Sequence, residues 1–199
     1  LGIPVHYEMA DVYPLALRAN RAEHPGLLSR IARNATLAEW LDRFVIRRAA
    51  SVFVVSEESR ERCLSLGAAP DAAVVVGNTP AELPELGAEY PLPADLVGWE
   101  DRSIVLFLGN LLGDRGLLEA VEAVTRARQA VPKIALAIIG DGPEYPRLAE
   151  RISALGAGEF VRLLGWKGYR DHPPYYSHAA VGILPFLATE HINITLANK

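Results

Sequence analysis

A glycine-bearing segment at residues 107–123, FLGNLLGDRGLLEAVEA, contains residue types that bind phosphate groups. Its apolar run ends at Gly109, and an amphipathic stretch begins after Arg115 and Gly116. Glycine lets the main chain turn sharply and approach a ligand closely, while the start of a helix offers unpaired N–H groups and a positive dipole end. A guanidinium can bind two phosphate oxygens at once. The pattern predicts that Arg115 contacts a phosphate, although a surface ion pair with Asp114 would account for the same two residues.

Three later segments place glycines or polar residues after apolar runs. Gly140 and Gly142 lie in IIGDGPEYPRL at residues 138–148, where we predict a tight turn that lines the same site. Trp166 follows a glycine in LLGWKG; it could lie beside a nucleobase, but burial as a structural tryptophan is the favoured interpretation. The last segment, at residues 184–199, has polar side chains ahead of a predicted helix, which could bind a ligand or cap that helix: Glu190, His191, Asn193, Thr195 and Lys199.

The elements that must position these residues alternate along the chain. Continuous apolar runs, typical of parallel strands covered on both faces, occur at 3–7, 51–55, 72–76, 103–108, 134–139, 160–164 and 181–185. Three- and four-residue apolar spacing predicts helices with one buried stripe at 37–48, 57–66, 117–130 and 147–155. The fold class is therefore α/β. Because the carboxyl ends of parallel strands share one edge, the four segments should converge on one ligand crevice.

The segment at residues 78–101 breaks this alternation with prolines and glycines, so we place the connection between two domains at 80–101. Residues 1–79 then form a first domain with only three strands, and residues 102–199 a second. Both ends look cut, which predicts an incomplete first domain and a nearly complete second one. An incomplete sheet leaves an open edge, which predicts self-association.

Composition excludes several classes of partner. The net charge of −4 comes from interspersed signs, which disfavours nucleic acid and anionic membranes. The single cysteine, Cys63, suits a structural thiol in a reducing compartment, and the apolar runs are too short for a membrane helix. An Asp-x-Asp triplet is absent, and His172 with His178 lack the spacing of a paired metal site, so no metal is expected.

The order of these motifs carries a family resemblance. IVLFLGNLLGDRGLLEAVEA, AIIGDGPEYPRL, FVRLLGW and PPYYSHAAVGILPF follow one another, and GIPVHYEMADVYP, SVFVVSEESRERCLSLG and VVVGNTP precede them. The chain resembles the family 4 (group 1) retaining glycosyltransferases of the GT-B fold. It departs from their pattern at Asn110, where a phosphate-binding arginine is common, and at Arg115, where lysine is commoner. Ala10 replaces a histidine, and Ile194 stands where the first of two family glutamates would fall.

The resemblance implies two Rossmann-like domains of GT-B type and transfer of a sugar, with retention, from a nucleotide-diphosphate sugar to a glycan, lipid or other acceptor. Arg115 and Lys199 would stabilise the departing diphosphate. His6 and Asp11 would lie on the acceptor side, although a structural role is the alternative for His6. Donor-binding residues would be Gly109, Asn110, Gly116, Gly140, Gly142, Trp166, Glu190, His191, Asn193 and Thr195.

The resemblance also implies no cofactor, no metal and no nucleic acid partner. It implies a cytoplasmic location, possible attachment to the inner membrane face, and a role in cell-envelope or exopolysaccharide biosynthesis. The 199 residues alone would be inactive, since half of the acceptor domain and the end of the donor site would be missing. Two alternatives remain open at this point. One is an enzyme like the sugar-nucleotide 2-epimerases; the other is a non-catalytic module that binds sugar nucleotides.

Overall fold

The computed structural model describes residues 3–19, 34–77, 79, 88–189 and 192. The chain forms two compact units, unit 1 with Leu1–Ala81 and Ala188–Asn198, and unit 2 with Glu82–Leu187 and Lys199. Each unit has its own parallel sheet and its own apolar core. The predicted α/β class with Rossmann-like sheets is confirmed.

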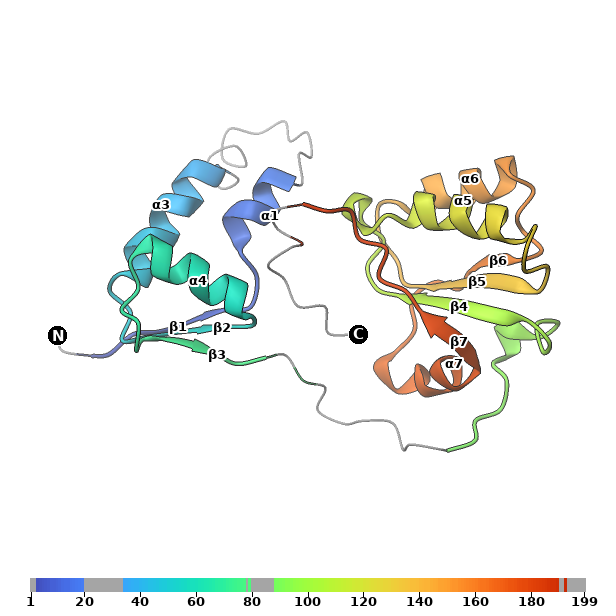
Figure 1. The fold of residues 1–199 in the computed structure, drawn as a ribbon, viewed down its shortest axis with the longest axis horizontal. Coiled ribbons are helices and arrows are strands. Elements are labelled where there is room, and N and C mark those ends of the chain that lie inside the picture. The colour runs from blue at the N-terminus through green and yellow to red at the C-terminus, as the bar shows by residue number, and fades with distance from the viewer. Residues whose placement is uncertain (1–2, 20–33, 78, 80–87, 190–191, 193–199) are drawn as a thin grey trace. The chain divides into compact units, whose positions relative to one another are not determined.

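Unit 1 contains a three-stranded parallel sheet in the order β1-β2-β3, and Figure 1 shows its helices on one face of that sheet. Asn34 caps the start of α3, and Ser56 caps the start of α4, which ends at Gly67 in the left-handed conformation. The elements are β1 (His6–Met9), α1 (Tyr13–Ala19), α3 (Ala35–Ile46), β2 (Ser51–Val54), α4 (Glu57–Leu66) and β3 (Ala73–Val75).

A buried polar cluster joins three elements of unit 1. The Tyr7 hydroxyl on β1 donates a hydrogen bond of 2.8 Å to Oδ1 of Asp42 on α3, and Nη1 of Arg62 on α4 lies 3.8 Å from Oδ2 of Asp42. Burial, followed by the hydrogen bond to Asp42, raises the pKa of Tyr7. Burial also raises the pKa of the neighbouring Cys63 thiol to about 11. The thiol therefore stays neutral and packs as a small apolar group.

Unit 2 contains a four-stranded parallel sheet in the order β6-β5-β4-β7. Figure 1 shows α5 and α6 on one face and α7 on the other, where α7 packs against β4 and β7. The elements are η1 (Ala94–Leu96), β4 (Ser103–Leu108), η2 (Gly113–Arg115), α5 (Leu117–Ala127), β5 (Ile134–Ile139), α6 (Tyr145–Ala154), β6 (Val161–Leu163), η3 (Tyr169–Asp171), α7 (Pro173–His178) and β7 (Ala179–Gly182).

The described end of the expected inter-domain connection, residues 88–101, packs within unit 2. Leu96 and Trp99 are buried in its core, and the Trp99 indole N–H donates to the carbonyl of Glu159. The Arg162 guanidinium donates to the carbonyl of Asp95 and lies 4.3 Å from the Trp99 ring. This part of the chain is therefore a fixed portion of unit 2.

The structure differs from the sequence expectations in three places. Helices α1 and α7 were not expected. In unit 1 the described helices cover one face of the sheet, where both were expected to be covered. The apolar stripe of α3 was expected to be buried, yet Leu37, Trp40 and Phe44 are exposed while Asp42 is buried.

None of the described helices is long and apolar enough to cross a bilayer.

Adding a side chain at a glycine can cost stability through a steric collision or through an unfavourable positive φ, and three glycines in unit 2 distinguish these two costs. A Cβ at Gly140 would collide with the carbonyl of Gly109, and its φ is +143°; Gly156 has φ +60° in open space, and Gly158 has neither constraint. Substitution by alanine should lower the free energy of unfolding by more than about 3 kcal/mol at Gly140 and by about 1–2 kcal/mol at Gly156. At Gly158 the change should stay within about 0.5 kcal/mol.

Urea denaturation of the three variants measures these differences. Equal losses of unfolding free energy in the Gly140 and Gly156 variants would show that the close approach of Gly140 to the carbonyl of Gly109 does not add to the cost.

The raised pKa of Cys63 predicts loss of stability in alkali. An unfolded thiol releases its proton near roughly pH 8.5, whereas the native thiol holds it to about pH 11, so the unfolded chain binds fewer protons above pH 8.5. The contribution of the Cys63 thiol to the free energy of unfolding is therefore fully present below pH 8.5, and it should fall by about 1–2 kcal/mol as pH rises to 10. The fall should be absent in Cys63→Ala. Urea midpoints across this range measure it, and parallel profiles for the two proteins would contradict the assignment.

Candidate functional site

The carboxyl ends of the four strands of unit 2 form one continuous edge. We call residues 109–116, 140–143, 164–168 and 183–187 the strand-exit rim. Main-chain hydrogen bonds of 2.9 Å join its neighbouring segments: Gly109 N to Ile139 O, Leu111 N to Asp141 O, Gly140 N to Gly165 O, and Leu187 N to Asp114 O. Three of the four segments that the sequence placed at one crevice, and residues 184–187 of the fourth, therefore lie together.

The glycines of the rim let its segments touch one another. A Cβ at Gly140 would collide with the carbonyl of Gly109, and a Cβ at Gly142 with that of Leu111. Another at Gly116 would collide with the carbonyl of Pro185. The sequence predicted that these glycines let the main chain approach a ligand. The structure shows that they are needed for the contact between neighbouring loops. Their contact with a donor, and that of Gly109, stay predictions.

The start of α5 presents free main-chain donors at this rim. Gly116, with φ +63°, ends η2 and precedes α5, and no side chain caps the first turn of the helix. The first N–H groups of a helix carry its positive dipole end, which favours an anion. Asn110 is exposed on the same segment. The geometry thus supplies an anion-binding position at the β4 exit.

Arg115 lies beside this helix start and is largely buried. Its Nε is 3.5 Å from Oδ1 of Asp114, and its Cζ lies 4.5 Å from the centre of the Phe186 ring. The side chains of Arg115 and Asp114 are only 16% and 10% exposed, so the ion pair expected at the surface is inside the rim. Nε of Arg115 and Oδ1 of Asp114 are buried without a hydrogen-bond partner. Asp114 and Phe186 therefore hold the Arg115 guanidinium in one position beside the start of α5.

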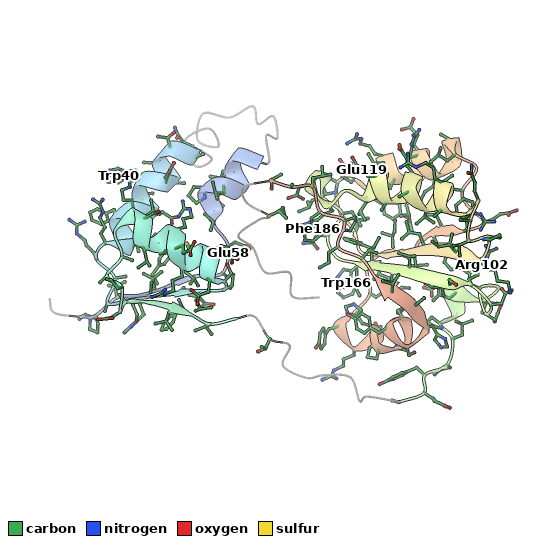
Figure 2. All side chains as sticks on the ribbon, in the orientation of Figure 1. Trp40, Glu58, Arg102, Glu119, Trp166 and Phe186 are labelled. Atoms are coloured by element: carbon green, nitrogen blue, oxygen red, sulfur yellow. The ribbon has the colours of Figure 1, made fainter. Side chains whose placement is uncertain are left out.

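Trp166 projects from the rim after β6. It is 75% exposed, so the expectation of burial was wrong (Figure 2). Gly165, with φ +68°, turns the chain just before it. An exposed indole beside an anion-binding edge can stack on a planar group such as a nucleobase.

A polar cluster that the sequence analysis missed lies next to Trp166. Nζ of Lys167 is 2.7 Å from Oδ2 of Asp95, which also accepts a hydrogen bond from the Tyr175 hydroxyl. The hydrogen bond to Asp95 raises the pKa of Lys167, and burial followed by the same carboxylate raises that of Tyr175. Lys167 and Arg115 are the two cations of the rim in the described part of unit 2, and each lies beside a carboxylate, that of Asp95 and that of Asp114.

The two residues predicted for the acceptor side lie towards opposite ends of β1 in unit 1. His6 begins the strand, where its Nδ1 is 2.6 Å from the Ser51 hydroxyl and its ring stacks on Phe53. Asp11 lies two residues beyond the other end of β1, a strand that runs about 10 Å from His6 to Met9. Asp11 is therefore at the strand-exit edge and His6 is not.

The remaining predicted residues fall outside the described part of the chain, and their roles stay predictions: Glu190, His191, Asn193, Thr195 and Lys199.

Cavities lie near the strand exits of both units. In unit 2, one of about 130 Å³ separates the starts of α5 and α6, which is small for an organic ligand, and two of about 400 and 570 Å³ lie beside β7 and are lined in part by Ile183 and Leu184. A further cavity, of about 490 Å³, lies at the strand-exit edge of unit 1 and was not foreseen. Its walls are mostly apolar, with one carboxylate: Glu8, Ala10, Phe53, Val54, Val55, Val76, Gly77 and Thr79. Among the described residues, no group of three or more histidines, cysteines or carboxylates could hold a metal ion.

Solved structures share this fold. HepE from Anabaena in complex with UDP aligns with a TM-score of 0.60 at 16% identity, covering 93% of this chain and 47% of that chain. The HepE complex with UDP-glucose gives a TM-score of 0.62 at 16% identity, covering 90% of this chain and 46% of that chain.

Curated relatives match nearly the whole chain. The α-D-kanosaminyltransferase of Streptomyces kanamyceticus is 25% identical over 93% of this chain and 47% of its own length. The 2-deoxystreptamine glucosyltransferase of the same organism is 23% identical over 96% of this chain and 49% of its own length. The chain thus spans about half the length of these relatives. The family model for glycosyl transferases group 1 matches residues 94–198, which is more than half of the sequence. The chain belongs to the group 1 glycosyltransferase family.

Proposed function

We propose that the protein is a retaining glycosyltransferase and that the strand-exit rim of unit 2 binds the diphosphate of its nucleotide-sugar donor. The observation that carries the proposal is the buried Arg115, held between Asp114 and Phe186 at the uncapped start of α5. Relatives named as glycosyltransferases, and solved structures of similar fold that contain UDP and UDP-glucose, support it. Those names favour transfer over epimerisation.

The chemistry follows from the charge that develops in the reaction. As the bond between sugar and diphosphate breaks, negative charge grows on the departing oxygen and positive charge on the sugar ring. A guanidinium and helix N–H groups fixed beforehand near that oxygen stabilise the transition state more than the ground state. The contact with Phe186 and the ion pair with Asp114 hold the Arg115 guanidinium in place, so little reorganisation is needed. These groups can supply the stabilisation without a cofactor.

The acceptor is proposed to enter through unit 1. The apolar cavity at its strand-exit edge has a volume within the range of small-molecule sites, and Glu8 lines it. Asp11 lies at the same edge. A wall of this kind suits an acceptor that has both an apolar part and a polar or cationic group. Transfer assays with glycan and lipid acceptors distinguish between these kinds of acceptor.

Arg115→Ala should weaken binding of UDP by about 1.5–3 kcal/mol while leaving binding of uridine nearly unchanged, because the lost contact is to phosphate. Isothermal titration of the chain with both ligands measures the difference. The matched control is Arg126→Ala, which removes an exposed arginine from the last turn of α5, far from its start, and should change neither affinity. Equal affinity for UDP in Arg115→Ala and in the unchanged protein would remove Arg115 from the donor site.

Trp166→Ala should give the complementary result. If the exposed indole stacks on the base, its loss should weaken UDP and uridine alike, by about 1–3 kcal/mol, because the contact does not involve phosphate. The same titrations test it. A loss confined to UDP, or no loss, would exclude base stacking without affecting the assignment of Arg115.

A further inference from the structure

The main chain just before Trp166 is anchored to the sheet of unit 2. Leu164 donates a hydrogen bond of 2.8 Å to the carbonyl of Ile138 on β5, and the carbonyl of Gly165 accepts one of 2.9 Å from Gly140. These two bonds fix the chain up to the residue that precedes the indole. The chain on the other side of Trp166 is held by side chains instead.

The carboxylate of Asp95 holds the residue that follows Trp166. Nζ of Lys167 lies 2.7 Å from Oδ2 of Asp95, and the Tyr175 hydroxyl donates to the same carboxylate, 2.8 and 2.9 Å from its two oxygens. We call Asp95, Lys167 and Tyr175 the Asp95 cluster. The side chains of Lys167 and Asp95 are only 27% and 31% exposed, so water competes for this ion pair less than for a fully exposed one.

The main chain after Trp166 is held as well. Nε2 of the buried His172 donates to the carbonyl of Lys167 at 3.3 Å, and Gly168 N donates to Oδ2 of Asp171 at 3.1 Å. Lys167 is thus fixed through both its side chain and its carbonyl. The main chain of Trp166 therefore has anchored residues on both sides, although its indole is 75% exposed (Figure 2).

Asp95 itself lies on a firm support, although it comes from the segment before β4. Nη1 of Arg162 on β6 donates to the carbonyls of Asp95 and Val97, at 2.8 and 3.1 Å. The next residue, Leu96, is buried in the core of unit 2. The Asp95 carboxylate can therefore hold Lys167 in place rather than follow its motion.

A second ion pair of the same kind in unit 2 has none of this shielding. Nζ of Lys133 lies 2.9 Å from Oδ2 of Asp101, but the two side chains are 66% and 70% exposed. Water competes for both groups, so this pair should restrain little. It provides a matched control for the pair of Lys167 with Asp95.

We propose that Asp95 is a positioning residue of the donor site, which acts through Lys167 and Tyr175 to keep the Trp166 indole in place for the nucleobase. The proposal rests on the proposed function, because it takes the base to stack on Trp166. A side chain that a ligand must first order costs binding free energy, so a segment fixed beforehand binds the base more tightly. Asp95 needs no contact of its own with the ligand.

The motion of the Trp166 indole tests the role of the Asp95 cluster without any ligand. The chain has three tryptophans, and the indole N–H signal that disappears in Trp166→Ala identifies the one to follow by ¹⁵N relaxation. Its order parameter should lie above roughly 0.7 in the unchanged chain and fall below about 0.6 in Asp95→Asn and in Lys167→Met. Lys167→Arg, which restores a cation for Asp95, should preserve it, and Asp101→Asn should leave it unchanged.

Titration with uridine tests the link to the donor. Asp95→Asn should weaken uridine binding about two- to tenfold, because the ligand must then order the segment itself. In a Trp166→Ala background the same substitution should cost nothing further, since both residues act through one contact with the base. A merely structural role for Asp95 predicts the same loss in both backgrounds.

The outcomes separate this proposal from the proposed function. An unchanged order parameter in Asp95→Asn and Lys167→Met, or an equal loss of uridine affinity with and without the Trp166 indole, would overturn the role of Asp95 alone. Should Asp95→Asn lower the thermal midpoint, Lys167→Met decides, because it breaks the ion pair and leaves the hydrogen bond from Tyr175 in place. Binding of neither UDP nor uridine by the unchanged chain would overturn the proposed donor site, and the positioning role with it.

Discussion

Unit 2 depends on main chain packing directly against main chain at the carboxyl ends of its strands. Gly140 meets the carbonyl of Gly109, and Gly116 meets that of Pro185, with no room for a side chain between them. This approach keeps the β4, β5 and β7 exits within one edge. It also brings Phe186 beneath Arg115, two residues far apart in sequence. The cation, the aromatic ring and the free N–H groups of α5 are in place because the loops can touch.

Much of the fold could be predicted because buried parallel strands are written as continuous apolar runs. The bounds of β4 and β5 were predicted to the residue, as were those of α4. Helices α1 and α7 were not predicted because they are short and begin around prolines, which in a sequence usually indicate a turn or the end of a helix. The orientation of α3 was wrong for another reason: periodicity shows that a helix has an apolar side, but not which side meets the sheet.

The location of the candidate site was predictable, whereas its internal contacts were not. The expectation that the strands are parallel, together with the rule that ligands bind at strand exits, predicts the edge from sequence alone. The pairing of Arg115 with Phe186 depends on how two distant loops pack, which no local pattern records. Trp166 was expected to be buried because tryptophan is highly buried on average, but the left-handed Gly165 precedes it and the indole lies outside. The sequence singled out the glycines of the rim correctly, but only the structure shows that they are needed for contact between loops.

A recognition edge built largely of main chain has a consequence for how new specificities could arise. At the glycine positions almost any substitution deforms the scaffold, so evolution has little freedom there and the part of a ligand facing them should stay the same among descendants. Exposed positions on the same edge, such as Asn110 and Trp166, can change without disturbing the packing. A library that randomises only such positions would explore alternative bases or sugars while every member retains an intact framework.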